Sequence, residues 1–74
     1  MLPQAGRQYQ VPSDAFEERR RVVVNDGGRH HGRYGTIYYA ELGTIRRVVL
    51  DRVEATGAPE CRIECRVRDL ILAD

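Results

Sequence analysis

Lysine and tryptophan are both absent from this 74-residue chain, and phenylalanine and methionine occur once each. Its two cysteines are too few for a framework of disulfide bonds, which excludes the small secreted proteins that depend on one. No apolar run approaches the roughly 20 residues that a helix needs to cross a membrane. Residues 1–6 lack a basic stretch followed by an apolar one, so no secretory signal is predicted. These absences predict a cytoplasmic protein that does not contact a membrane.

The charge is nearly balanced, with 12 basic residues, all of them arginine, against 11 acidic residues. The resulting formal net charge of +1 argues against a surface directed generally at polyanions. The exclusive use of arginine has two explanations: a genome rich in G and C, or a need for planar groups that bind carboxylates or phosphates at two points. A chain this short buries only a modest core, so contacts with further copies or with a partner are expected.

Strict alternation of apolar and charged residues predicts a strand over residues 61–68. Its apolar face carries Cys61, Ile63, Cys65 and Val67, and its charged face carries Arg62, Glu64, Arg66 and Arg68. Three further strands are predicted at 21–24, 36–42 and 70–72, where β-branched, aromatic or aliphatic residues cluster between turn residues.

Two further predictions concern which side chains of one strand share a face, and whether another segment is a strand or a helix. In the strand over 36–42, alternation predicts Ile37 and Tyr39 on one face, with Tyr38 and Ala40 on the other. Residues 44–53 fit either a strand or an amphipathic helix, and their β-branched residues favour the strand.

A short helical turn is predicted at residues 13–17, with Asp14 as its cap and Glu17 completing a capping box. Residues 1–12 are predicted to be a flexible tail, and residues 13–74 a single domain. About five short strands with turns between them predict an all-β fold, namely a small, bent antiparallel barrel.

The stretch from Val22 to Ile37 joins an apolar strand to a loop with glycines at 28, 32 and 35. The residues between and beside these glycines are Arg29, His30, His31, Arg33 and Tyr34. This pattern resembles the KOW motif of SH3-like barrels. The resemblance implies an SH3-like barrel over residues 20–73 and a function in binding RNA or protein.

The segment Pro12-Ser13-Asp14-Ala15 is similar to one that precedes the barrel of plasmid-borne, trimethoprim-insensitive dihydrofolate reductases. That likeness implies a homo-oligomeric enzyme of mobile-element origin. Those enzymes line their central pore with a Val-Gln-Ile-Tyr run, where this chain has Arg62-Ile63-Glu64-Cys65.

The histidines and cysteines do not have the spacing of a metal site or a catalytic pair. His30 and His31 are adjacent, and Cys61 and Cys65 would lie about 13 Å apart along an extended strand. Both thiols are therefore predicted to be reduced groups in the core, and no metal, cofactor or catalytic residue is predicted.

The basic loop is the predicted binding site. Its glycine N–H groups, Arg29 and Arg33 could hold a phosphate, His30 and His31 could add charge, and Tyr34 could stack on a base or pack on a peptide. A second basic surface is predicted from Arg62, Arg66 and Arg68, with Tyr38 exposed beside it.

The leading prediction is a small, non-enzymatic module that contacts the backbone of RNA or DNA through the basic loop. The alternative is a protein-interaction or inhibitor module of phage or plasmid origin that docks on a larger complex. The near-neutral net charge favours this alternative. A third hypothesis is an oligomeric enzyme like the plasmid reductases.

Overall fold

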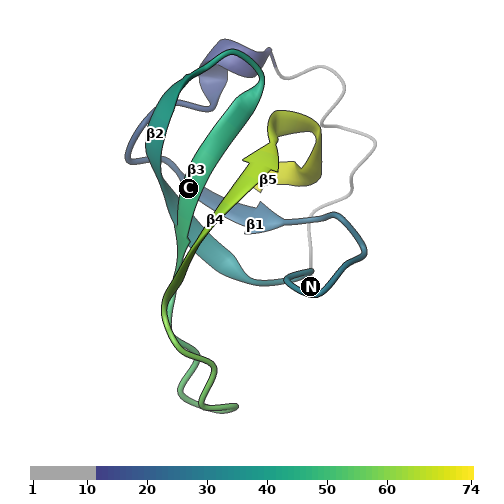
Figure 1. Cartoon of the computed structure of the whole chain (residues 1–74), viewed down its shortest axis with the longest axis vertical. Coiled ribbons are helices and arrows are strands. Elements are labelled where there is room, and N and C mark those ends of the chain that lie inside the picture. The colour runs from purple at the N-terminus through teal and green to yellow at the C-terminus, as the bar shows by residue number, and fades with distance from the viewer. Residues whose placement is uncertain (1–11) are drawn as a thin grey trace.

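The computed structural model describes residues 12–74, so all of the predicted tail except Pro12 lies outside the described residues. These residues form five antiparallel strands and two single 3-10 turns (Figure 1). The strands are β1 (Arg21–Val24), β2 (Tyr34–Leu42), β3 (Ile45–Leu50), β4 (Cys61–Arg66) and β5 (Leu70–Leu72), and the turns are η2 (Ser13–Ala15) and η3 (Val67–Asp69). The predicted all-β class, with a short helical turn before the first strand, is confirmed.

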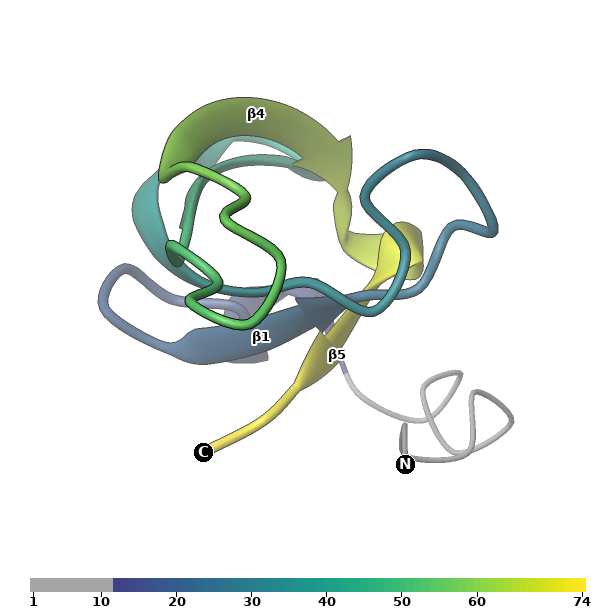
Figure 2. The same ribbon diagram turned by 90° about the horizontal axis from the view of Figure 1, so that it is seen from below.

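The strands belong to a single sheet in the order β4-β3-β2-β1-β5. The sheet curls on itself, so that β4 faces β1 and β5 from the opposite side of the molecule (Figure 2). Every pairing is antiparallel, and η3 carries the chain from β4 across to β5. The result is a small barrel-like fold. Among residues 12–74, no helix has the length and apolar character that would let it cross a membrane.

The core fills the inside of the curled sheet. Its buried members are Phe16, Val22, Val24, Ile37, Val48, Leu50 and Leu70. Cys61, Ile63, Cys65 and Val67 pack against this cluster and are half-buried. The charged residues that alternate with them are exposed, so the predicted apolar and charged faces of residues 61–68 are confirmed. The strand itself ends at Arg66, where the chain turns into η3.

Residues 44–53, which fitted both a strand and a helix, form the strand Ile45–Leu50. β3 pairs with β4 without interruption, from Ile45 opposite Arg66 to Leu50 opposite Cys61. The β-branched residues explain this outcome, because Val48 is fully buried against the core while Val49 points the other way. A bridge between Val53 and Ala58 closes the loop that follows.

The predicted faces of β2 are wrong beyond Tyr38. The register with β3 shifts between Ile37 and Tyr39, where one strand carries an extra residue. This irregularity changes the parity of the strand, so Ala40 packs against the core, as Ile37 does. Tyr38 is exposed, as predicted, and Tyr39 is half-buried.

The predicted capping box at the first helical turn is also wrong. The N-cap residue of η2 is Pro12, and the turn has no side-chain cap. Asp14 lies inside the turn, two residues after the N-cap position, so its side chain cannot serve as the N-cap. The segment is held instead by Arg46 of β3, a residue that is only 4% exposed. Its guanidinium donates hydrogen bonds to four carbonyl oxygens, those of Ser13, Phe16, Gly43 and Ile45.

Candidate binding site

The loop between β1 and β2 holds itself in shape through its own polar groups. The N–H of Gly28 donates to the carboxylate of Asp26 at 2.8 Å, and the N–H of Gly27 donates to Nδ1 of His31 at 2.9 Å. Gly32 has a φ of 86°, a conformation that residues with a Cβ rarely adopt. The loop begins beside η3, where the N–H of Asn25 donates to the carbonyl of Asp69. It is therefore a shaped surface that is joined to the end of the barrel.

The two arginines of the loop are placed very differently. Arg29 is exposed to solvent, whereas Arg33 is partly buried. A terminal nitrogen of Arg33 donates to the carbonyls of Asp51 and Pro59, at 2.8 and 3.1 Å. The Nε of the same side chain is buried and has no hydrogen-bond partner. Arg33 therefore joins the loop to the segment after β3, and of the two it is Arg29 that points into solvent.

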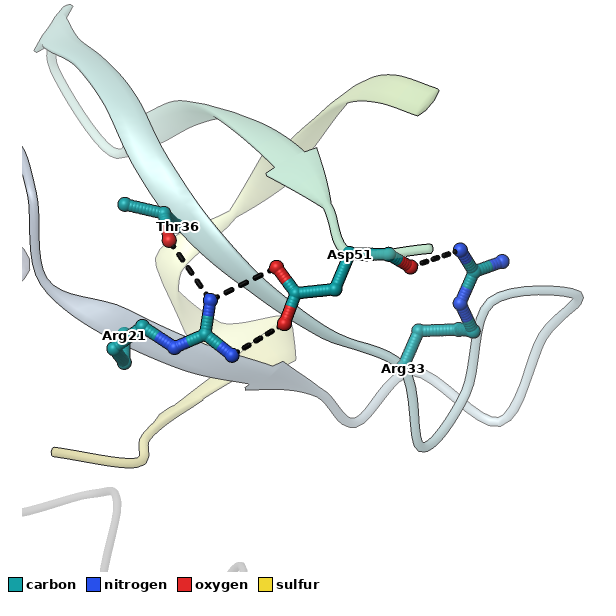
Figure 3. Close-up of polar contacts among 4 residues, drawn as sticks. All are labelled: Arg21, Arg33, Thr36 and Asp51. Atoms are coloured by element: carbon teal, nitrogen blue, oxygen red, sulfur yellow. Dashed lines mark hydrogen bonds and ion pairs between the residues drawn. The ribbon is translucent and has the colours of Figure 1, made fainter. Parts of the chain in front are cut away.

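Arg21 and Asp51 form a fixed ion pair beside this loop (Figure 3). The guanidinium donates to both carboxylate oxygens, at 2.9 and 2.5 Å, and also to the hydroxyl of Thr36 at 2.9 Å. The hydrogen bonds from Arg21 lower the pKa of Asp51 below its ordinary value, and those to Asp51 raise the pKa of Arg21. The pair thus presents a charge of each sign in a defined geometry.

These groups line a shallow groove of about 540 Å³. Its lining comes from the basic loop and from the segment after β3, and it includes Arg21, His31, Arg33, Tyr34, Asp51 and Val53. Tyr34 is 45% exposed there, so a large part of its ring is open to solvent. His31, Arg33 and Tyr34 were predicted from the sequence, whereas Arg21 and Asp51 were not. Only knowledge of the strand pairing could have found them, because they are 30 residues apart in the chain.

The second predicted surface lies apart from the groove, on the outer face of β2, β3 and β4. Arg62 lies over the ring of Tyr38 at 5.4 Å, and Arg47 lies over Tyr39 at 5.2 Å. Arg47 also pairs with Glu64 at 3.2 Å. Arg66 and Arg68 are exposed and line a separate depression at the end of β4. The structure therefore does not bring Arg62, Arg66 and Arg68 together with the loop residues in one pocket.

Both cysteines are free thiols and are half-buried. Burial raises the pKa of Cys65 to about 11, and the nearby carboxylates of Asp26 and Asp69 contribute to the increase. Across residues 12–74, histidine, cysteine and acidic side chains form no group of three or more that could hold a metal ion.

Comparison with known proteins gave no match: no family model, curated protein or solved structure is detectably similar to this chain. The likeness to KOW barrels and to the plasmid reductases therefore stays a prediction from short motifs. Any functional assignment has to depend on the geometry of the groove and of the surrounding surface.

Proposed function

We propose that this protein is a binding module that docks on another protein through the groove around Tyr34. The observation that carries the proposal is the exposed ring of Tyr34 in a groove whose charges are already fixed by hydrogen bonds. Tyrosine and arginine are the residues that most often dominate the energy of protein–protein contacts. Because the Arg21–Asp51 pair is formed before binding, ordering these side chains costs little when a partner arrives.

The charge of the molecule favours a protein partner over a nucleic acid. Residues 12–74 contain all 11 acidic residues and, without Arg7, 11 of the 12 arginines, so their formal net charge is zero. Binding to a phosphate backbone without regard to sequence depends on a clear positive excess. In addition, Arg33 donates to two carbonyls of its own chain, which leaves Arg29 as the exposed arginine of the basic loop.

The lining also indicates the chemistry of the partner segment. Arg52 and Glu54 form an ion pair at the groove, with both side chains well exposed to solvent. Val53 and Tyr34 supply apolar surface in the same groove. A peptide segment with an apolar side chain and flanking charges of both signs would match this surface.

A pull-down with three forms of the chain tests the proposal. Wild type, Tyr34→Ala and Tyr38→Ala would be used as bait in a lysate, with and without nuclease, and the captured proteins identified by mass spectrometry. Tyr38 is the matched control, since it is 40% exposed but does not line the groove. We expect a partner that is retained by wild type and Tyr38→Ala, survives nuclease, and is lost with Tyr34→Ala.

A direct binding measurement tests the competing hypothesis, which is that the chain binds nucleic acid. The purified chain would be titrated with single-stranded and double-stranded oligonucleotides at low salt. Binding that is weakened by Arg29→Ala, together with captured proteins that disappear on nuclease treatment, would overturn protein docking in favour of nucleic-acid binding. The affinity of such binding should also fall as the salt concentration increases. The slope of log affinity against log salt should be steeper when the chain contacts more phosphates.

A further inference from the structure

β4 is an edge strand. It stands at one end of the sheet order, and within residues 12–74 it pairs with β3 alone. The N–H of Val67 donates to the carbonyl of Thr44, which continues the β3–β4 register by one residue. In an antiparallel pair, hydrogen-bonded positions alternate. Ile63 therefore directs its backbone groups toward β3, whereas Arg62 and Glu64 direct theirs outward, to the free edge.

The apolar side of this edge is incompletely covered. Val48 and Leu50 of β3 are fully buried, but their partners on β4, Ile63 and Cys61, are only half-buried. Cys65 is half-buried as well. A row of apolar side chains thus continues to the rim of the sheet, directly beside outward-pointing backbone donors and acceptors. Such edges are the usual place where a further strand adds to a sheet.

The sequence of this edge is complementary to itself. If a second copy of residues 60–66 ran antiparallel with Ile63 at the two-fold axis, Arg62 would lie opposite Glu64 of the second copy. Arg66 would then lie opposite Glu60, Cys61 opposite Cys65, and Ile63 opposite Ile63. All four charged positions meet the opposite sign, and the apolar positions meet one another. Opposite charges at facing positions of paired strands stabilise the pair.

The backbone supports the same register. Arg62 and Glu64, which would face each other, are the residues whose N–H and C=O point outward, so the two strands can exchange hydrogen bonds there. Shifting the axis to Glu64 would place Glu64 against itself and Arg62 against Arg66. Shifting it to Cys65 would leave only residues 64–66 of the strand paired, because β4 ends at Arg66.

We propose that two copies of this chain associate through β4, antiparallel and centred on Ile63, to form one continuous sheet. The edge uses none of the residues that line the Tyr34 groove, so this inference does not depend on the proposed docking function. The partner in this case is the chain itself, because each charge on the edge finds its complement in a second copy.

Charge exchange tests the association. Sedimentation equilibrium of the full chain should show a dimer. Arg62→Glu or Glu64→Arg alone should weaken it by about tenfold or more, because each change turns two attractive cross-strand pairs into repulsive ones. The double variant Arg62→Glu/Glu64→Arg should restore it. Arg47→Gln is the control, since it breaks the Arg47–Glu64 contact within the chain without changing the edge. A wild-type chain that stays monomeric at millimolar concentration overturns the proposal.

Cross-linking tests the register. A chain with Cys61→Ala keeps only Cys65, and a chain with Cys65→Ala keeps only Cys61. Under a mild oxidant such as copper phenanthroline, neither variant alone should form a covalent dimer, whereas their mixture should. Circular dichroism of each variant would verify that the fold is kept. Efficient cross-linking of either variant with itself, or none in the mixture, would contradict pairing about Ile63.

Discussion

Arg21 and Asp51 are joined at two points across an intervening strand. Arg21 belongs to β1, Asp51 follows β3, and Thr36 of β2 shares the same guanidinium. Three neighbouring strands are thus connected by one side chain on the outside of the sheet. The pair forms one wall of the Tyr34 groove, so the stability of the barrel and the shape of the groove depend on the same contact.

The first prediction concerns this pair and acid. Because Arg21 lowers the pKa of Asp51, the pair stabilises the fold above the ordinary carboxylate pKa of 3.8, and this stabilisation is lost as pH falls through the lower folded value. At pH 7, Asp51→Asn should lower the free energy of unfolding by about 1 kcal/mol or less, since both side chains are partly exposed.

Urea unfolding from pH 7 down to pH 2.5 measures this effect. The wild type and Asp51→Asn should converge at the acid end. Glu54→Gln, which removes the carboxylate of a well-exposed pair, should follow the wild type at every pH. A constant difference between wild type and Asp51→Asn down to pH 2.5 would show that ionisation of Asp51 is not the cause.

The second prediction concerns the buried arginine. Arg46→Met keeps the apolar stem but removes the guanidinium that donates to the carbonyls of Ser13, Phe16, Gly43 and Ile45; the carbonyl of Ser13 keeps only the N–H of Phe16 as a donor. The free energy of unfolding should fall by about 3 kcal/mol. The neighbouring change Arg47→Met removes an exposed side chain and should cost under about 1 kcal/mol. If chemical denaturation shows that both variants lose the same free energy of unfolding, burial of the Arg46 guanidinium does not add to its contribution to stability.

The third prediction compares two glycines of the motif. A Cβ at Gly35 would lie 2.6 Å from the carbonyl oxygen of Val49, and this neighbour is backbone that cannot move aside. Gly35→Ala should therefore destabilise the fold by roughly 3 kcal/mol and loosen the β2–β3 pairing. At Gly28 a Cβ would meet only the side chain of Asp26, at 3.4 Å. Gly28→Ala should leave the melting temperature within about 2 °C of wild type.

The fourth prediction concerns Cys65. With its pKa raised to about 11, a small fraction of the thiol is ionised at pH 8, and the thiolate is the form that reacts. Alkylation by iodoacetamide at pH 8 should be at least about tenfold slower in the folded chain than in urea, and should accelerate up to about pH 11. Mass spectrometry after proteolysis would assign the modified site. Equal rates in native and denatured protein would show that the thiol is not protected.

The strands could be predicted because the alternation of apolar and polar residues indicates which side chains share a face. In residues 61–68 every second residue is apolar, and the same rule applied backwards from Leu50 and Val48 places Arg46 on the inner face of β3. A buried arginine is stable only when acceptors satisfy its guanidinium, and two of its four carbonyl partners, those of Ser13 and Phe16, lie in a segment that is distant in the sequence.

Two other features could not be predicted in this way. The irregularity in β2 moves Ala40 to the core face, and a run of tyrosines and small residues carries no mark of the shift. The groove depends on Arg21 and Asp51 meeting across β2, which follows from sheet order and not from local pattern. The inward turn of Arg33, which the sequence grouped with the other residues of the basic loop, depends on the position of Pro59 and has no local signal.

Phe16 is the sole phenylalanine of the chain, and it enters the core from outside the sheet. Its carbonyl is held by Arg46, while its ring is buried among residues of the strands. No strand hydrogen bond has to break for this segment to swing away, so we expect local opening at this end to cost less free energy than global unfolding. Amide hydrogen exchange should therefore be faster in residues 15–16 than in the centre of β3. The interior would be exposed to solvent at this end before any strand separates.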